Sequence, residues 1–214
     1  MLARLLLGNT SITKGHEPRK TPMSELQFDE ATHVYSVNGV RVPSVTQIIH
    51  VVYGIPWAAE EYYLLRGQAV HACAALSLQG KDYDFDPSIR PQVKAIEQFL
   101  RDTKFKAIRI EQPFYSKAFG IAGKPDAIGS ICDQTVILDW KASPSKQDWL
   151  QLGFYSLLTD VMHGLVVQIS DDETYSMSKV VPLKMWRLKA QNTLAVYNIM
   201  KNDLEMKPTN RKAE

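Results

Sequence analysis

The chain has 214 residues, a length that suits one domain with short terminal additions. Hydrophobic residues make up 45% of it and charged residues 22%, the composition of a globular protein that can bury a sizeable core. The formal net charge of +2 neither predicts nor excludes nucleic-acid binding. Because Cys73 and Cys132 are the two cysteines, a disulfide scaffold and a four-thiolate iron–sulfur cluster within one chain are excluded.

Residues 1–7 form an apolar stretch that is too short for the core of a signal peptide and far too short to span a membrane. We expect residues 1–22 to be a lightly packed leader, with Met23 as an alternative start. A weak organellar presequence stays open, because the first acidic residue is Glu17. No other segment approaches membrane-spanning length, so the expectation is a soluble, cytoplasmic protein without a membrane partner, in the host cytoplasm if a phage encodes it.

Residues 28–45 are predicted to form a β-hairpin, because valines recur there and Asn38-Gly39 tolerates the positive φ of a tight turn. Ser44 or Thr46 is then a candidate cap for a short helix.

The rest of the chain alternates helical and extended patterns. Apolar residues at helical spacing predict helices, and runs of β-branched and aromatic residues predict strands. In chain order we expect helices at 57–78 and 88–102, strands at 107–115, 120–129 and 135–141, a helix at 145–161, strands at 164–169 and 174–181, and a helix at 182–206 before a basic tail at 207–214. This order predicts a single domain over residues 23–206 with a mixed α/β (α+β) fold, in which helices flank a central mixed sheet.

Two carboxylates and one ammonium are expected to meet on neighbouring strands. Asp139 and Lys141 alternate with Trp140 on an apolar strand, so both project from one face, about 7 Å apart along the backbone. Two antiparallel strands joined by a turn at residues 130–134 would bring Asp126 beside Asp139. Carboxylates this close repel unless a cation lies between them, and hard oxygen ligands suit Mg²⁺ or Mn²⁺.

This group has the chemistry that phosphodiester cleavage needs. One or two divalent ions would activate water and offset charge at phosphorus, and Lys141 would orient the water or stabilise the developing charge. The alternative is a solvated edge on which Asp139 and Lys141 form an ion pair. Ile137 and Leu138 instead favour a buried strand, where charges need a purpose.

These motifs resemble the PD-(D/E)XK nuclease superfamily, in particular its RecB-like and phage-type exonuclease branch. Pro125-Asp126 and Asp139-Trp140-Lys141 match the signature, and the likeness spans residues 28–155. The N-terminal hairpin is also similar to that of the mitochondrial genome-maintenance exonuclease. The resemblance implies a restriction-endonuclease-like core. The lack of a four-cysteine box argues against the cluster-bearing CRISPR-adaptation and helicase-associated members.

Two helical motifs of that branch are present as well. Gly67 and His71 match its Gly-x-x-x-His pattern, which implies that His71 is a metal ligand; a lone helical histidine is otherwise more often a surface or core residue. Gln151 and Tyr155 match its Gln-x-x-x-Tyr pattern, one turn and about 6 Å apart on one helix face. The family uses this pair near the metal site and the bound strand, whereas the alternative is a pair that borders the core.

The resemblance assigns roles to a larger set of residues. It implies catalytic roles for Asp126, Asp139, Lys141 and Gln151, metal ligation by His71, Asp126, Asp139 and the backbone carbonyl of Trp140, and DNA contacts from Arg66, Ser143, Gln151 and Tyr155.

Of three further candidates, Arg66 and Glu111 keep a plain alternative. Ser143 sits where relatives often place Ser or Thr near a phosphate. Arg66 would grip a terminal phosphate bidentately, or is an exposed helix residue. Glu111 would aid the metal site directly or through water, or is an exposed strand residue. Most of four aromatic residues are expected in the core, with stacking on unpaired bases as the alternative: Trp57, Tyr62, Tyr63 and Trp149.

The sequence therefore predicts a Mg²⁺- or Mn²⁺-dependent deoxyribonuclease. The residues themselves argue for phosphodiester hydrolysis. Exonuclease action on linear duplex DNA, and a role in phage-type recombination beside a single-strand annealing protein, are implied by the resemblance, and an oligomer stays open. The alternatives are a structure-specific or site-specific endonuclease on the same core, and an inactive DNA-binding or assembly protein. The intact acidic residues, lysine and histidine speak against the inactive form.

Overall fold

A six-stranded mixed sheet organises the fold in this computed structural model, which describes residues 26–30, 32–55 and 61–205. Its strands are β4 (Lys106–Ile110), β7 (Ala127–Ile131), β8 (Gln134–Lys141), β9 (His163–Ile169), β10 (Tyr175–Met177) and β11 (Val181–Pro182). They lie in the order β10-β9-β8-β7-β4, with β11 also paired to β9. Of these pairs only β8 and β9 run parallel, so the expected mixed sheet is confirmed.

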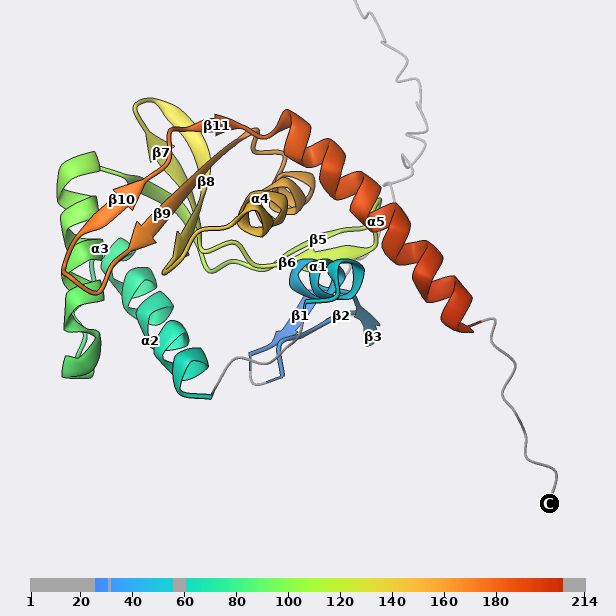
Figure 1. Cartoon of the computed structure of the whole chain (residues 1–214), viewed down its shortest axis with the longest axis horizontal. Helices are drawn as coiled ribbons and strands as arrows, with labels where there is room; N and C mark the ends of the chain where they lie inside the picture. Colours follow the sequence, from blue (N-terminus) through green and yellow to red (C-terminus); the bar gives the residue numbers. More distant parts are fainter. Residues whose placement is uncertain (1–25, 31, 56–60, 206–214) are drawn as a thin grey trace, which may run out of the picture.

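Helices cover both faces of the sheet (Figure 1). They are α1 (Val45–Tyr53), α2 (Glu61–Leu78), α3 (Arg90–Thr103), which follows the 3₁₀ turn η1 (Pro87–Ile89), α4 (Lys146–Thr159) and α5 (Lys184–Glu205). Residues of α2 and α3 pack with one face of the sheet, and residues of α1, α4 and α5 pack with the other. Because α4 connects the parallel strands β8 and β9, it lies directly against the sheet, as such a crossover requires.

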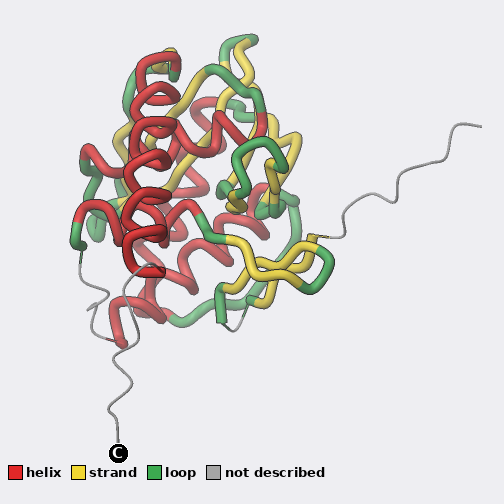
Figure 2. The backbone as a smooth tube through the Cα atoms, turned by 90° about the vertical axis from the view of Figure 1, so that its right-hand side faces the viewer, coloured by secondary structure: helices red, strands yellow, loops and turns green. Residues whose placement is uncertain are grey.

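Two smaller β-structures lie apart from the central sheet, as Figures 1 and 2 show. The strands β1 (Leu26–Asp29), β2 (Val34–Val37) and β3 (Val40–Val42) form an antiparallel meander, and β5 (Phe114–Ser116) pairs with β6 (Ile121–Gly123). Asn38 and Gly39 have positive φ in the turn between β2 and β3, which confirms the expected hairpin. Ser44 caps α1 by accepting a hydrogen bond from the Gln47 N–H at 3.1 Å.

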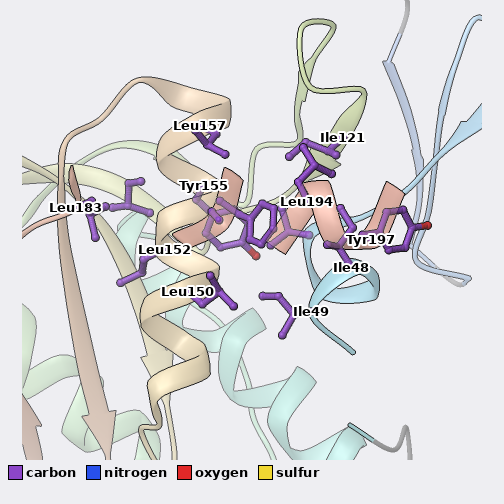
Figure 3. Packing of buried hydrophobic residues seen from close by; sticks show 14 of the residues in the cluster. Ile48, Ile49, Ile121, Leu150, Leu152, Tyr155, Leu157, Leu183, Leu194 and Tyr197 are labelled. Atoms are coloured by element: carbon purple, nitrogen blue, oxygen red, sulfur yellow. The ribbon is translucent and has the colours of Figure 1, made fainter. Parts of the chain in front are cut away.

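Side chains of β8 alternate between the two hydrophobic clusters. Leu138 and Trp140 belong to the cluster with α2 and α3, where the Trp140 ring packs edge to face on Phe99 at 5.1 Å. Ile137 belongs to the cluster with α4, of which Figure 3 shows Leu150, Leu152 and Tyr155. Since neighbours on a strand point to opposite faces, Asp139 and Lys141 share the α4 side, and Trp140 points away from them as expected.

Three expected strands are interrupted, so those predictions were wrong in extent. The expected strand at 107–115 divides into β4 and β5, and that at 120–129 divides into β6 and β7. The reason is that β5 and β6 leave the central sheet and pack against α4, and Glu111 turns the chain with a φ of 48°. The expected strand at 174–181 divides into β10 and β11, which pair with different parts of β9.

Some expectations lie outside the described residues: the leader 1–22 with Met23, the first residues 57–60 of the long helix, Met206 and the tail 207–214. Among the helices that are described, none is both long and apolar enough to cross a membrane.

Candidate active site

The pairing of β7 with β8 places the two predicted carboxylates side by side. Ala127 pairs with Leu138, so the same register sets Asp126, just before β7, opposite Asp139. Cys132 and Asp133, with φ of 47° and 59°, form the tight turn that joins the strands, inside the predicted turn. Asp126 Oδ2 accepts a hydrogen bond from the backbone N–H of Trp140 at 2.8 Å, which fixes the carboxylate across the strands.

The helix α2 brings His71 to the same point. His71 Nδ1 lies 3.2 Å from Asp126 Oδ1. The Asp126 carboxylate raises the pKa of His71 to about 9, although burial of the ring opposes this. Burial alone would raise the pKa of Asp126, but the charges of His71 and Lys141 and the hydrogen bonds hold it below its ordinary value. The pair is therefore an imidazolium beside a carboxylate near neutral pH.

Lys141 neutralises the second carboxylate. Its Nζ lies 3.0 Å from Asp139 Oδ1 and 2.8 Å from Oδ2, and only the Oδ1 contact has hydrogen-bond geometry. Asp139 is 1% exposed, and this burial raises its pKa to about 7 against the opposing effect of the ammonium. Burial would lower the pKa of Lys141, but the charges of Asp139 and Asp126 raise it above its ordinary value. The lysine therefore stays charged.

Gln151 and Tyr155 continue this polar chain from α4. Lys141 Nζ donates to Gln151 Oε1 at 3.4 Å, and Gln151 Nε2 donates to the Tyr155 hydroxyl at 2.8 Å. Burial, aided by the charges of Asp139 and Asp126, raises the pKa of Tyr155 well above its ordinary value, so the phenol is neutral. The predicted Gln-x-x-x-Tyr pair thus lies against the lysine and also borders the core.

A donor set for a divalent cation is present. Among the described residues, His71, Glu111 and Asp126 each offer an atom within 4.8 Å of the others. Asp139 stands outside that group, but its Oδ2 is a buried oxygen that makes an ion pair with Lys141 and no hydrogen bond within the described chain, so it keeps lone pairs for a cation. One imidazole nitrogen with several carboxylate oxygens fits a divalent ion.

Glu111 lies at the bend after β4 and not on the strand, which corrects its expected position. Its N–H donates to the Asp126 carbonyl at 3.0 Å, so the backbone holds it next to the site. Burial and the Asp126 charge raise the pKa of Glu111, while Lys124 opposes this from 2.5 Å.

A cavity of about 180 Å³ opens beside these residues and is lined in part by Arg66, His71 and Lys141. Arg66, which is predicted to contact a phosphate, donates to Asp171 Oδ1 at 2.8 Å and so forms an ion pair with a carboxylate in this structure. Ser143 is exposed in the turn after β8 and is not part of that lining, and its role and that of the Trp140 carbonyl stay predictions.

The aromatic candidates divide. Tyr62 and Tyr63 are 62% and 60% exposed, so the expectation that they belong to the core was wrong. Trp149 packs against the core and stacks on Trp186. Trp57 lies outside the described residues.

Sequence reasoning missed several residues around the site. Asp148 accepts hydrogen bonds from the Ser145 N–H and hydroxyl and lies 3.8 Å from Lys141 Nζ. The Ser-x-x-Asp spacing of a capping box was a readable signal for it. Gln92 and Asp171, which line the cavity, carry no such signal because they come from α3 and from the loop after β9.

No protein-family model and no curated protein matches the sequence. Solved structures do match: an alkaline exonuclease, LHK-Exo, from Laribacter hongkongensis, at 11% identity over 76% of this chain and 89% of that one, with a TM-score of 0.45. The same enzyme in complex with dAMP matches at 11% identity over 77% and 90%, with a TM-score of 0.42. The protein SSO0001 matches at 18% identity over 72% and 75%, with a TM-score of 0.35.

These three likenesses are weak, each with a TM-score below 0.5, so the assignment depends on the residues of this chain. The mixed sheet, the paired Asp126 and Asp139, and Lys141 beside them are the features that the motifs predicted. In its sheet and in the placement of these motif residues, the chain resembles the PD-(D/E)XK nucleases.

Proposed function

We propose that this chain is a metal-dependent deoxyribonuclease that hydrolyses phosphodiester bonds as an exonuclease on linear duplex DNA. One observation carries the proposal: the β7–β8 register sets Asp126 opposite Asp139, while α2 supplies His71 and Lys141 is bound to Asp139. Buried charges of both signs at one end of a sheet are costly unless they bind a ligand or react. Mg²⁺ or Mn²⁺ is the proposed cofactor.

The roles of the residues follow from their contacts. His71, Glu111 and Asp126, joined by Asp139 and the Trp140 carbonyl, would hold one or two ions. When bound, such an ion lowers the pKa of a water and offsets charge on the phosphate.

Lys141 orients the attacking water or stabilises charge that develops on phosphate oxygen, since its ammonium is held charged at the site. Gln151 and Tyr155 position the lysine from α4. Arg66 and Ser143 contact the DNA backbone.

The exonuclease mode is supported by the motif resemblance, as is a role in phage-type recombination beside a single-strand annealing protein. A labelled digestion tests the mode. Linear duplex carrying separate labels at its 5′ and 3′ ends should be degraded from an end with Mg²⁺ or Mn²⁺ and remain intact with EDTA. A covalently closed circle should resist. Rapid cutting of the circle would instead identify an endonuclease.

Lys141→Ala is the variant that tests the site in this digestion. It should abolish cleavage while DNA affinity stays nearly intact, because one ammonium is lost while the other proposed DNA contacts remain. Lys146→Ala, at an exposed lysine of α4, is the matched control and should cut normally. Cleavage by Lys141→Ala at a near wild-type rate would remove the lysine from the mechanism.

A calorimetric titration with Mn²⁺ separates the nuclease from an inactive DNA-binding protein. The wild-type chain should bind Mn²⁺ saturably, and Asp126→Ala should lose that binding. His71→Ala should weaken it, and His163→Ala, a histidine on β9, should leave it unchanged. Absence of Mn²⁺ binding by the wild-type chain would favour the inactive protein.

A further inference from the structure

The cavity beside the candidate metal ligands is lined by both apolar and charged side chains. Val70, Trp140 and Ile169 give it apolar walls, and the exposed ring of Tyr63 stands at its edge. His71 and Lys141 also line it, so it opens directly onto the candidate active site. Its volume of about 180 Å³ is smaller than the 300–1,000 Å³ that is usual for whole small-molecule ligands. The cavity therefore suits one flat group that belongs to a larger ligand.

Three polar side chains from different elements meet at this cavity. Arg66 of α2 donates through a terminal nitrogen to Asp171 Oδ1, and the amide of Gln92 on α3 donates to the same oxygen. Asp171, from the loop after β9, thereby holds the arginine and the glutamine together. Gln92 is 4% exposed, whereas the side chains of Arg66 and Asp171 are 25% and 73% exposed, so the group extends from the interior at Gln92 to the surface at Asp171.

One donor and one acceptor of this group have no partner. Within the part of the chain that the structure describes, the Nε–H of Arg66 and Oε1 of Gln92 are buried and make no hydrogen bond. Groups of this kind are rare in folded proteins and each calls for an explanation, because burial without a partner costs free energy. A ligand that carries an acceptor beside a donor would satisfy both.

An unpaired nucleobase has this chemistry. Each of the four bases carries a donor next to an acceptor on its Watson–Crick edge, and the faces of the ring are apolar enough for walls such as Val70 and Trp140. A glutamine amide can turn to present either its oxygen or its nitrogen. A phosphate fits less well, because the Gln92 oxygen and the Asp171 carboxylate would repel it. The pair therefore suits bases as a class.

We propose that this cavity is a subsite for one unpaired base of the strand being cut, bound at its Watson–Crick edge by Arg66 and Gln92. The proposal deepens the nuclease function and rests on it for the identity of the ligand. It assigns to Gln92 a role in substrate binding that no motif of the sequence indicated. The base would lie beside the candidate metal ligand His71, and the phosphodiester attached to the same nucleotide would lie within reach of Lys141.

Mononucleotide binding in EDTA tests the subsite apart from cleavage. Calorimetry with dAMP, dCMP, dGMP and dTMP should show each binding about tenfold or more tighter than deoxyribose 5-phosphate, since base stacking and the edge contacts add to the phosphate. Equal affinity for the nucleotides and for deoxyribose 5-phosphate would overturn the proposal. Strong preference for one base over the other three would contradict binding of bases as a class.

Gln92→Leu is the variant that probes the edge contact. It should reduce nucleotide affinity about tenfold, the loss typical of a hydrogen bond to a buried partner, and leave deoxyribose 5-phosphate unchanged. Gln191→Leu, at an exposed position of α5, is the matched control and should bind like wild type. Retention of the nucleotide preference by Gln92→Leu would remove the glutamine from the subsite.

A measurement on the wild-type chain guards against misfolding of that variant. In an NMR titration, the side-chain amide resonances of Gln92 should shift with each nucleotide and stay in place with deoxyribose 5-phosphate. Unmoved resonances on saturation with nucleotide would overturn the proposal. If the wild-type chain cleaves DNA with metal but binds nucleotides no better than deoxyribose 5-phosphate, the subsite alone is rejected. If it prefers nucleotides but never cleaves DNA, the proposed nuclease function is rejected.

Discussion

Two partly buried charge pairs lie side by side at the site, and their hydrogen bonds differ. His71 is bound to Asp126, whose other oxygen accepts from the backbone, whereas Lys141 is shared between Asp139 and the Gln151 amide. Removing one partner of such a pair leaves a buried charge uncompensated. Gln151 holds the lysine beside Asp139 without carrying a charge itself, so we expect it to act as a positioning residue whose loss leaves no charge unpaired.

Gln151→Leu should lower kcat about 10- to 100-fold with little change in KM, a loss typical of residues that orient a catalytic group. The physical reason is that the Lys141 ammonium loses the contact that fixes it toward the site. Gln147→Leu, an exposed glutamine on the same helix, is the control and should keep wild-type kcat. Steady-state kinetics on linear duplex measures both, and a change confined to KM would place Gln151 in DNA binding instead.

The His71–Asp126 pair should make the stability of the metal-free chain depend on pH. The carboxylate raises the pKa of His71 to about 9 in the folded state, above the ordinary 6.5 of the unfolded state. The folded chain then binds the proton more tightly, so this contribution is complete below about pH 6.5 and is lost as pH rises through 9.

Urea unfolding in EDTA from pH 6 to 10 measures this effect. The free energy of unfolding of the wild-type chain should fall between about pH 6.5 and 9 relative to His71→Gln, because the variant lacks the titrating ring. The difference between the two proteins isolates this histidine from the other groups. A constant difference across that range would contradict an imidazolium paired with Asp126.

At the scale of elements, local signals predicted what local chemistry decides. The β7–β8 hairpin, and with it the approach of Asp126 to Asp139, followed from alternation and a turn of short span. The cap at Ser44 and the Asn38-Gly39 turn followed for the same reason. These features depend only on residues that are close in the sequence, so the centre of the site could be predicted from the sequence.

Features that depend on distant neighbours were not readable. Nothing in the pattern at 107–115 indicates that β5 leaves the sheet to pack against α4, because both environments bury apolar residues. The same limit hid Gln92 and Asp171, which meet Arg66 only after three elements have packed together. The exposed positions of Tyr62 and Tyr63 were missed because aromatic residues are usually buried.

The packing of α4 on α5 depends on Gly153. A Cβ built on this glycine would lie 2.4 Å from the backbone oxygen of Trp186, a contact that a side-chain rotation cannot relieve. Gly153→Ala should therefore destabilise the chain by about 1–3 kcal/mol, the usual cost of overpacking. Urea unfolding measures the change.

Gly67→Ala is the matched control for that substitution. Gly67 also lies in a helix, but a Cβ there has nothing within 4 Å. Alanine restricts the unfolded chain more than glycine, so the control should be neutral or more stable by about 0.4–1 kcal/mol. Equal destabilisation by both variants would mean that the close approach of the helices does not set the cost.

At the scale of the whole molecule, the site needs both helical layers. The helix α2, which covers one face of the sheet, supplies Arg66 and His71, and α4 on the opposite face supplies Gln151 and Tyr155. Two carboxylates at the end of β8 and the start of β7 lie between the two layers. The position of Lys141 and the proposed contacts with metal and DNA therefore depend on the packing of both helical layers.

The balance of charge also belongs to the whole chain. With 25 Lys and Arg residues against 23 Asp and Glu residues, long-range attraction to DNA is weak, so the proposed DNA binding would have to come from local phosphate contacts. Each contact releases a counterion and contributes about −0.9 to the slope of log affinity against log salt. The affinity of the metal-free chain for short duplexes should thus fall steeply as salt rises.

Arg66→Gln should reduce the magnitude of that slope by about 1, because the proposed backbone contact of a guanidinium that keeps its ion pair with Asp171 is lost. Lys189→Gln removes an exposed charge that lies over Trp186 on α5, away from the cavity, and should leave the slope unchanged. Fluorescence anisotropy at a series of KCl concentrations measures all three proteins. A DNA affinity that does not change with KCl concentration would contradict binding through contacts with the DNA backbone. Equal slopes for wild type and Arg66→Gln would instead confine the arginine to its ion pair with Asp171 and to the base edge.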